Sequence, residues 1–254
     1  MNNTEKKEIN PIIYIINLDS AVERKKSVEQ ELLKTNIPFE FVSAVDKTSL
    51  SSIKHKVKNK YKKKLNPAEI GCYLSHIKIK KLFLKSNYNF AIILEDDIKL
   101  LNDFDEIVKK AIKQRLTITK KHQWDVLKLK SYGHKKLIKI NNIDNKYSLF
   151  GGGVAITTLA AIWTRKGAEL FIENSKEKEN FIIEMPIDCA LQKPWKYNLK
   201  IYNISPEITK SNGFKSQIRP KKKVKSNFFK RINYETIKLI PRGYYFIKTW
   251  IFKQ

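Results

Sequence analysis

The chain has 254 residues, enough for one large domain or two small ones, and its 42% apolar and 11% aromatic content excludes collagen-like, linker-like and wholly disordered proteins. Its 51 Lys and Arg residues outnumber 25 Asp and Glu residues, so the formal net charge is +26. Such a charge implies attraction to an anion, which would be nucleic acid, an acidic membrane surface or a phosphorylated substrate. Two cysteines are too few for a disulfide scaffold or a zinc site, and we expect neither a signal peptide nor a membrane span.

The start of the chain predicts a strand–helix–strand unit. Residues 12–16 form an apolar, β-branched run that is typical of a buried parallel strand. Ser20, followed three residues later by Glu23, has the pattern of a capping box, which predicts a helix that ends before Pro38. Residues 39–45 then predict a second strand.

A lysine-rich segment separates this unit from a second helix. Residues 47–64 have little apolar content and include seven lysines from position 54 onward. We expect a solvated loop or an irregular helix there, and the alternative is a mobile basic loop near an anionic ligand. Asn66 as N-cap, Pro67 at the first helical position and Glu69 at the third then predict the start of a helix.

The rest of the chain alternates between strand and helix patterns. Residues 90–94 form a continuous apolar run, which predicts a buried strand that ends abruptly in Glu95, Asp96 and Asp97. The later predictions are a helix over 103–118, a strand over 126–129, an extended segment over 154–164, a helix over 166–174, a short helix from Pro186 and a strand over 199–204. This alternation predicts an α/β fold.

The three adjacent carboxylates predict a ligand site. Adjacent negative charges repel each other, and a cation would explain them, because Mg²⁺ and Mn²⁺ prefer oxygen ligands. Ligands of open α/β sheets bind outside the carboxyl ends of the strands, where these acids fall. The alternative is a turn whose acids cap the next helix. Glu69 and His76 share one face of the preceding helix, either to support this site or as structural residues.

Taken together, these motifs resemble those of glycosyltransferase family 25, the bacterial lipooligosaccharide galactosyltransferases that are related to collagen galactosyltransferases. The similar segments, in the family's order, are residues 16–19, 23–24, 67–72, 75–76, 93–97, 164–170 and 185–188. The resemblance extends from about residue 11 to about residue 218. It implies a GT-A type fold with a mostly parallel central sheet, a nucleotide-sugar donor that is usually UDP-galactose, and inverting transfer to a growing saccharide.

The resemblance also implies roles for individual residues. Asp97 is expected to bind a divalent metal ion, Mn²⁺ or Mg²⁺, with Glu95 and Asp96 contributing to the metal or to the donor ribose. The residues expected to bind the nucleotide-sugar are Asn17, Leu18, Arg24, Glu69, His76, Glu95 and Asp96. Inverting transfer needs one general base for the acceptor hydroxyl, for which Asp188 is the first candidate and Glu184 the second. The alternative role of Asp188 is an N-terminal helix cap.

The sequence predicts a catalytic domain over residues 1–213 and a basic aromatic extension over residues 214–254. The extension has 12 Lys and Arg residues, one Glu and nine aromatic residues. Anionic membranes attract basic segments, and aromatic rings insert at their interface. We therefore expect a peripheral protein on the cytoplasmic face of the inner membrane, beside a lipid-linked saccharide acceptor. The alternative is a solvated tail with some aromatic residues packed on the domain.

Three other functions are alternatives to this interpretation. The positive charge would suit a nucleic-acid-binding protein, because basic residues supply nonspecific affinity by counterion release. The sequence has no zinc-finger, RNA-recognition or helix-turn-helix signature, so we expect no specific nucleic-acid partner. The acidic cluster would also suit a metal-dependent nuclease. The third alternative is an inactive family member that acts as a scaffold at a membrane surface.

Overall fold

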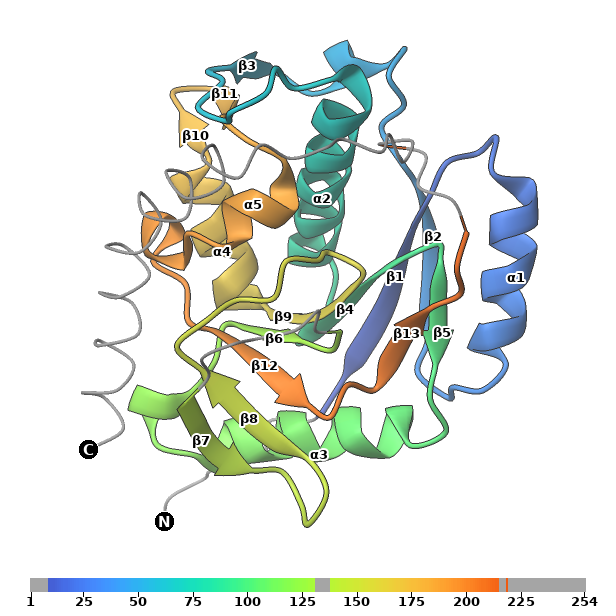
Figure 1. Cartoon of the computed structure of the whole chain (residues 1–254), viewed down its shortest axis with the longest axis vertical. Helices are drawn as coiled ribbons and strands as arrows, with labels where there is room; N and C mark the ends of the chain where they lie inside the picture. The colour runs from blue at the N-terminus through green and yellow to red at the C-terminus, as the bar shows by residue number, and fades with distance from the viewer. Residues whose placement is uncertain (1–8, 131–137, 215–217, 219–254) are drawn as a thin grey trace, which may run out of the picture.

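The centre of the computed structural model is an eight-stranded sheet (Figure 1). The structure describes residues 9–130, 138–214 and 218. In spatial order the strands are β2 (Phe39–Ser43), β1 (Pro11–Asn17), β4 (Phe90–Glu95), β9 (Ala160–Thr164), β6 (Val126–Lys128), β12 (Ile201–Ser205), β8 (Ser148–Gly151) and β7 (Ile138–Asn142). Strands β2, β1, β4, β6, β12 and β7 run in one direction, and β9 and β8 run in the other. The predicted α/β class with a mostly parallel central sheet is confirmed.

Helices cover both faces of this sheet. The helices are α1 (Val22–Leu32) and α3 (Phe104–Thr117) on one face, and α2 (Pro67–Lys85), α4 (Arg165–Asn174) and α5 (Ile187–Leu191) on the other (Figure 1). In β1, Tyr14 packs into the core beneath α2 and α4, whereas Ile13 and Ile15 pack into the core beneath α1 and α3. Burial on both sides explains why this strand is a continuous apolar run rather than an alternating one.

Two small sheets accompany the large one. The first contains β10 (Lys176–Glu177), β11 (Asn180–Ile183) and β3 (His55–Val57), and the second contains β13 (Thr209–Ser211) and β5 (Ile98–Leu100). Single 3-10 turns cover Leu50–Ser52, Lys120–His122 and Pro194–Tyr197. Strands β7 and β8 and these five short strands are not predicted from the sequence. Within the described ranges, no helix is both long and apolar enough to cross a membrane.

The lysine-rich segment is more ordered than predicted. Strand β3 pairs in parallel with β11, and the amide of Lys60 continues this contact by donating a hydrogen bond to the Glu184 carbonyl at 2.8 Å. The ammonium of Lys60 also forms an ion pair with the Glu184 carboxylate at 2.8 Å. The interpretation of residues 47–64 as a loop or irregular helix is therefore wrong where they form a strand, because distant partners order them.

Two other local predictions differ from the structure. The N-cap of α1 is Ala21, without a capping bond from any side chain of the described chain, so the predicted Ser20–Glu23 capping box is wrong. The amide of Ala21 instead donates to the Leu18 carbonyl at 2.8 Å, and this backbone turn delays the helix. Strand β9 begins only at Ala160, so the prediction of an extended segment over 154–164 holds for its second half.

Helix α2 begins as predicted and lies unusually close to the end of β2. The Asn66 side chain accepts a hydrogen bond from the Glu69 amide at 2.9 Å, and the Glu69 carboxylate accepts one from the Asn66 amide at 3.0 Å. A Cβ atom at Gly71 would lie 2.3 Å from the Val45 carbonyl oxygen, so this approach requires glycine. The Ser75 hydroxyl accepts a hydrogen bond from the Val45 amide at 2.8 Å, which fixes the same contact.

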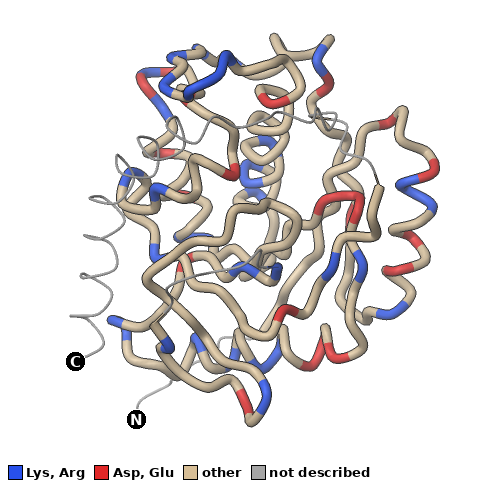
Figure 2. The backbone as a smooth tube through the Cα atoms, viewed as in Figure 1, with Lys and Arg blue, Asp and Glu red and all other residues tan. Residues whose placement is uncertain are grey.

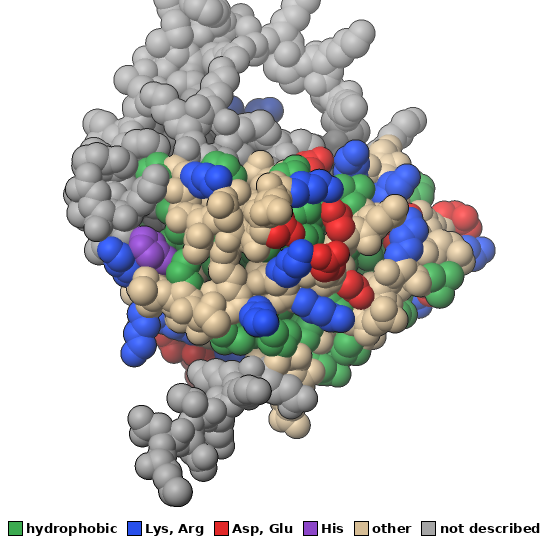
Figure 3. All heavy atoms as spheres, turned by 90° about the horizontal axis from the view of Figure 1, so that it is seen from below, with side chains coloured by type: hydrophobic (Ala, Val, Ile, Leu, Met, Phe, Trp, Pro, Cys, Tyr) green, Lys and Arg blue, Asp and Glu red, His purple; other side chains and the backbone are tan. Residues whose placement is uncertain are grey.

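Charged side chains are spread over the surface. Figure 2 shows Lys and Arg on most elements, together with an acidic stretch between β4 and β5. Figure 3 shows basic and acidic side chains intermixed on the face that it draws. This intermixed face differs from the basic stripe that is typical of nucleic-acid-binding domains.

Candidate active site

Two adjoining cavities lie at the carboxyl ends of β1 and β4, the edge at which open α/β sheets bind ligands. The larger cavity has a volume of about 430 Å³ and the smaller one about 270 Å³. Cys72, Glu95 and Ile218 line both cavities. The cavities are therefore two halves of one cleft, and Glu95 lies where they meet.

The larger cavity collects most of the predicted donor-binding residues. Its lining includes Leu18, Ser20, Arg24, Ser75, Glu95, Asp96 and Asp97. The lining of the smaller cavity includes Tyr61, Glu69, Thr157, Thr158, Pro186 and Asp188. The two cavities therefore differ in their chemical groups. The larger one has a guanidinium and adjacent carboxylates, and the smaller one has an aromatic ring and carboxylates that are separate in the sequence.

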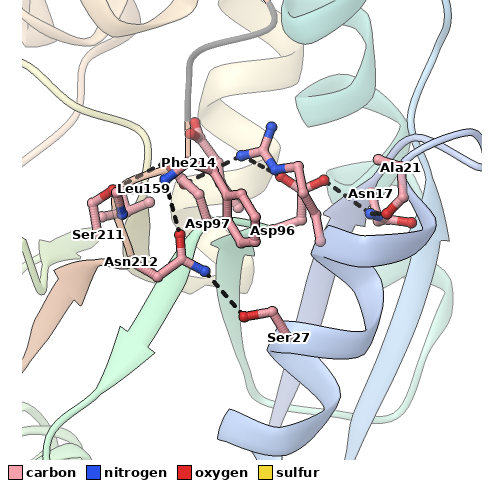
Figure 4. Close-up of polar contacts among 12 residues, drawn as sticks. Asn17, Ala21, Ser27, Asp96, Asp97, Leu159, Ser211, Asn212 and Phe214 are labelled. Carbon is pink, nitrogen blue, oxygen red and sulfur yellow. Dashed lines mark hydrogen bonds and ion pairs between the residues drawn. The ribbon is translucent and has the colours of Figure 1, made fainter.

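Asp96 is held by two side chains that come from the end of β1 and the start of α1 (Figure 4). Arg24 Nη2 lies 2.8 Å from Asp96 Oδ1, and Asn17 Nδ2 donates a hydrogen bond to Asp96 Oδ2 at 2.8 Å. Burial raises the pKa of the Asp96 carboxyl, and the Arg24 charge and the Asn17 hydrogen bond offset only part of that rise. Because both oxygens have partners, Asp96 serves to position Arg24 at the cavity.

Asp97 has one occupied and one unpaired carboxylate oxygen (Figure 4). Its Oδ2 accepts a hydrogen bond from the Ser211 hydroxyl at 3.1 Å. Its Oδ1 is buried and accepts no hydrogen bond from any described residue, and Arg24 Nη2 lies 3.8 Å away. Arg24 Nε is also buried, without a hydrogen-bond acceptor in the part of the chain that the structure describes. An unpaired acceptor and an unpaired donor thus occur on neighbouring side chains of the larger cavity, where a ligand would satisfy both.

Glu95 has a different environment from the two aspartates. It accepts a hydrogen bond from the Thr158 hydroxyl, which comes from the loop before β9. Burial raises the pKa of Glu95 to about 7, the Thr158 hydrogen bond opposes this rise, and the charges of Asp97 and Asp96 add to it. Glu95 is therefore partly protonated near neutral pH.

A layer of buried polar side chains lies behind Glu95. Ligand atoms of Cys72, His76 and Glu95 lie within 4.8 Å of one another, and neither ring nitrogen of His76 has a hydrogen-bond partner within the described ranges. Burial, together with the charges of Lys80 and Lys128, lowers the pKa of His76 well below its usual range, so the ring is neutral. Burial raises the pKa of the Cys72 thiol well above its usual range, and a cysteine binds a metal as the thiolate, so we do not assign this cluster as a metal site.

Lys128 supports the loop that carries Thr158. It lies at the end of β6 and is 1% exposed. Its ammonium donates a hydrogen bond to the Thr157 carbonyl at 2.7 Å. Burial lowers the pKa of Lys128 to about 8, and the charges of Asp188 and Glu95 oppose this shift. A buried ammonium therefore holds the loop whose Thr157 and Thr158 line the smaller cavity.

Asp188 is the better placed of the two candidate bases. It lies in the first turn of α5 and lines the smaller cavity, together with Glu69. The N-cap residue of α5 is Pro186, so Asp188 does not occupy the N-cap position itself. The Asp188 Oδ1 atom accepts a hydrogen bond from the Cys189 amide at 2.7 Å.

Glu184 lies outside the lining of both cavities, as the described residues define them. Its carboxylate forms ion pairs with Lys60 at 2.8 Å and with Lys196 at 2.5 Å. Burial would raise the pKa of Glu184, but the hydrogen bonds from Lys196 and Lys60 outweigh it, so the pKa is lowered. The geometry gives Glu184 the role of an anchor between β11, the lysine-rich segment and Lys196.

Several residues of the cleft are not predicted from the sequence. Ser211 lies more than a hundred residues from the Asp97 that it contacts, and no local pattern signals such a pairing. Thr158 reaches Glu95 from a loop whose path the sequence does not predict. Lys128 did carry a signal, because a lysine within an otherwise apolar strand must either find a buried partner or interrupt the strand.

The cleft lies at the carboxyl edge of the sheet, where open α/β folds bind their ligands, and it presents a guanidinium beside three adjacent carboxyl groups. The model of glycosyltransferase family 25 (LPS biosynthesis protein) matches residues 10–191. The chain therefore belongs to this family, and the resemblance predicted from the motifs is confirmed.

Three relatives illustrate the range of the family. The chain is 30% identical over 206 residues to a Haemophilus influenzae protein whose name assigns it provisionally to the glycosyltransferases, which covers 77% of this chain and 68% of that protein. It is 31% identical over 99 residues to a Haemophilus influenzae lipooligosaccharide biosynthesis protein, covering 38% and 37%. It is 27% identical over 137 residues to a procollagen galactosyltransferase of Xenopus laevis, covering 49% and 21%. The matched segment thus spans well under half of the second and third relatives.

Proposed function

We propose that the chain is a metal-dependent, inverting glycosyltransferase of GT-A type that transfers galactose from UDP-galactose to a growing lipooligosaccharide or a related surface glycan. Family membership supports glycosyl transfer, and the names of two relatives support the sugar and the acceptor class. The observation that carries the proposal is that Asp97 Oδ1 and Arg24 Nε, both buried at the larger cavity, have no hydrogen-bond partner among the described residues.

The residues present fit a divalent cation, because the cleft offers carboxylate oxygens and one of them is buried without a hydrogen bond from the described residues. Asp97 would hold the ion through Oδ1, and Glu95 is the second expected ligand. Mn²⁺ or Mg²⁺ bound there would supply a Lewis acid that stabilises negative charge on the departing diphosphate.

The larger cavity would hold the nucleotide and its diphosphate. Arg24 is oriented by Asp96, and its Nε–H group has no hydrogen-bond acceptor among the described residues. A guanidinium suits a phosphate oxygen as partner. Asn17 acts through Asp96, to which it donates a hydrogen bond, while Leu18 lines the cavity. The same residues keep the diphosphate at the carboxyl end of β4, next to the smaller cavity.

The smaller cavity would hold the galactosyl group and the acceptor hydroxyl. Asp188, which lines this cavity, would take the hydroxyl proton as the acceptor oxygen attacks the anomeric carbon from the face opposite the diphosphate. Glu69 lines the same cavity and would contact hydroxyl groups of the sugars. His76, which is buried and neutral behind Glu95, would support the donor site from within rather than touch the donor.

A panel of nucleotide-sugars tests this proposal. Purified protein is assayed for slow donor hydrolysis and for thermal stabilisation, with Mn²⁺ and with EDTA. We expect UDP-galactose to give the largest effects and EDTA to abolish hydrolysis. Asp97→Asn, which removes charge but little volume, should abolish transfer without changing the fold. Near-normal activity of that variant, or full activity in EDTA, would contradict the metal assignment.

The same panel, together with a nucleic-acid cleavage assay and a DNA mobility-shift assay, separates the alternative functions. An inactive scaffold would hydrolyse none of the donors. A metal-dependent nuclease would cleave nucleic acid in Mn²⁺ and ignore the sugars. A nucleic-acid-binding protein would shift DNA in a salt-dependent manner, whatever the state of Asp97.

We also propose that residues 214–254 bring the enzyme to the anionic cytoplasmic face of the inner membrane, where a lipid-linked acceptor would lie. The support is compositional, since 12 basic and nine aromatic residues accompany one acid, and all but Phe214 and Ile218 lie outside the described residues. Deleting residues 221–254 should abolish sedimentation with anionic liposomes and leave donor hydrolysis intact. Failure of the full chain to sediment at low salt would contradict the membrane role, and loss of folding after deletion would assign the aromatic residues to the core.

A further inference from the structure

A late segment of the chain lies against the carboxylate cluster. Strand β13 pairs antiparallel with β5, which begins directly after Asp97, and the register places Ser211 opposite Ile98. This segment follows residue 191, where the match to the family model ends. The carboxylate cluster is therefore contacted by a segment that lies outside the part of the chain that the family model matches.

Two contacts fix Asp97 from this segment (Figure 4). The Ser211 hydroxyl donates a hydrogen bond to Asp97 Oδ2 at 3.1 Å, and the Asn212 amide donates one to the Asp97 carbonyl at 2.8 Å. One carboxylate oxygen is thus occupied, while Oδ1 keeps no hydrogen bond from the described residues. The side chain is oriented with a single free oxygen.

The segment is itself anchored to α1. Asn212 Nδ2 donates a hydrogen bond to the Ser27 hydroxyl at 3.3 Å (Figure 4). The Phe214 ring lies 5.7 Å from the guanidinium carbon of Arg24, a cation–π contact. Gly213, between Asn212 and Phe214, has a φ of +87°, a left-handed conformation that favours glycine. The same short segment therefore contacts both Asp97 and Arg24 of the larger cavity.

The orientation of the Asp97 carboxylate decides whether Oδ1 stays apart from Arg24 or forms a hydrogen bond with it. Arg24 Nη2 lies 3.8 Å from Asp97 Oδ1, which is too far for a hydrogen bond but close enough to become one after a small rotation of the carboxylate. The hydrogen bond from Ser211 opposes that rotation, because it holds the other oxygen. Without it, Arg24 would compete with a cation for Oδ1.

We propose that Ser211 is a positioning residue that keeps Asp97 Oδ1 available to a divalent cation, a role that rests on the metal site of the proposed function. The Asn212 amide fixes the backbone of the same aspartate. The cation affinity of the cleft therefore depends on a residue beyond the matched region of the family.

The test measures Mn²⁺ alone, with no donor, by the electron paramagnetic resonance signal of the free ion. Ser211→Ala should weaken Mn²⁺ binding about tenfold, as removal of a group that orients a metal ligand does. The control is Lys210→Ala, an exposed neighbour on β13, which should leave Mn²⁺ affinity unchanged. Thermal unfolding of each variant reports the fold.

A matched pair guards against a variant that fails to fold. Ser211→Thr keeps the hydroxyl and should retain the wild-type affinity for Mn²⁺. Ser211→Val has the shape of the Thr variant without its hydroxyl and should bind Mn²⁺ as weakly as Ser211→Ala. Equal affinity of the Thr and Val variants would overturn the inference while leaving the metal site in place. Absence of Mn²⁺ binding by the wild-type chain would instead overturn the metal assignment, and this inference with it.

Discussion

Replacing Glu95 by Gln should stabilise the protein, and the gain should grow with pH. Burial raises the pKa of this carboxyl from 4.5 to about 7, so its proton is bound more tightly in the folded chain than in the unfolded one. The resulting contribution to the free energy of unfolding is fully present below pH 4.5 and is lost as the pH rises to about 7. An amide removes this loss, because it has no charge to bury and can still accept the Thr158 hydrogen bond.

The size of the effect follows from the shift. Each pKa unit corresponds to about 1.4 kcal/mol, so Glu95→Gln should raise the free energy of unfolding relative to the wild type by about 1 kcal/mol at pH 5 and about 3 kcal/mol at pH 8. About two thirds of this gain should appear between the two pH values, and most of the remainder below pH 5. A more stable Glu95→Gln variant would mean that the wild-type chain gives up stability in order to keep a carboxyl group in the cleft.

Urea unfolding at pH 5, 6, 7 and 8 in EDTA measures this difference without a bound metal. The control is Glu23→Gln, whose side chain is 81% exposed on α1 and whose replacement should change the free energy of unfolding by no more than about 0.5 kcal/mol at any pH. A difference that is the same at pH 5 and pH 8 would refute burial as the dominant influence on Glu95. A wild type that is more stable than Glu95→Gln at pH 8 would show that a partner stabilises the charged carboxylate.

Three further substitutions test the assignment of the general base and the packing of α2. Asp188→Asn should lower turnover by about 10²- to 10⁴-fold, as loss of a general base does, and leave the affinity for UDP-galactose with Mn²⁺ unchanged in calorimetry; a large loss of donor affinity would move Asp188 into the donor half. Glu184→Gln should leave turnover within about twofold, because this residue is an anchor, and a loss as large as that of Asp188→Asn would make it the base. Gly71→Ala should lower the free energy of unfolding by about 1–3 kcal/mol, since its Cβ would meet a backbone oxygen; unchanged urea unfolding would mean that α2 can shift away from β2.

The sequence predicts best what depends on near neighbours in the chain. The start of α2 is such a case, because Asn66 and Glu69 form the whole capping box between them. The strand ending in Glu95 is another, since a continuous apolar run needs no knowledge of its partners to be recognised as buried. Both features position the cleft, which is why the site could be located from the sequence.

What the sequence misses depends on contacts between distant segments. Strands β5 and β13 are three residues each, too short for an alternating pattern, and they form only because they pair with each other. The start of α1 is a local exception, because a backbone turn between Leu18 and Ala21 replaces the predicted Ser20 cap. The roles of Ser211 and Thr158 follow from contacts between distant segments, so only the folded chain reveals them.

Several unfavourable features of the described chain lie together at the carboxyl edge of the sheet. Buried polar groups normally have partners, and each unpaired one costs about 1–3 kcal/mol. Asp97 and Arg24 each keep one such atom at the larger cavity, and Glu95 keeps a carboxyl whose charge is disfavoured. Elsewhere, as at the α2 cap and in the core around β1, local preference and tertiary packing agree. Folding alone gives no reason to retain this cluster of costs, whereas a cation and a diphosphate bound at that edge would offset each of them.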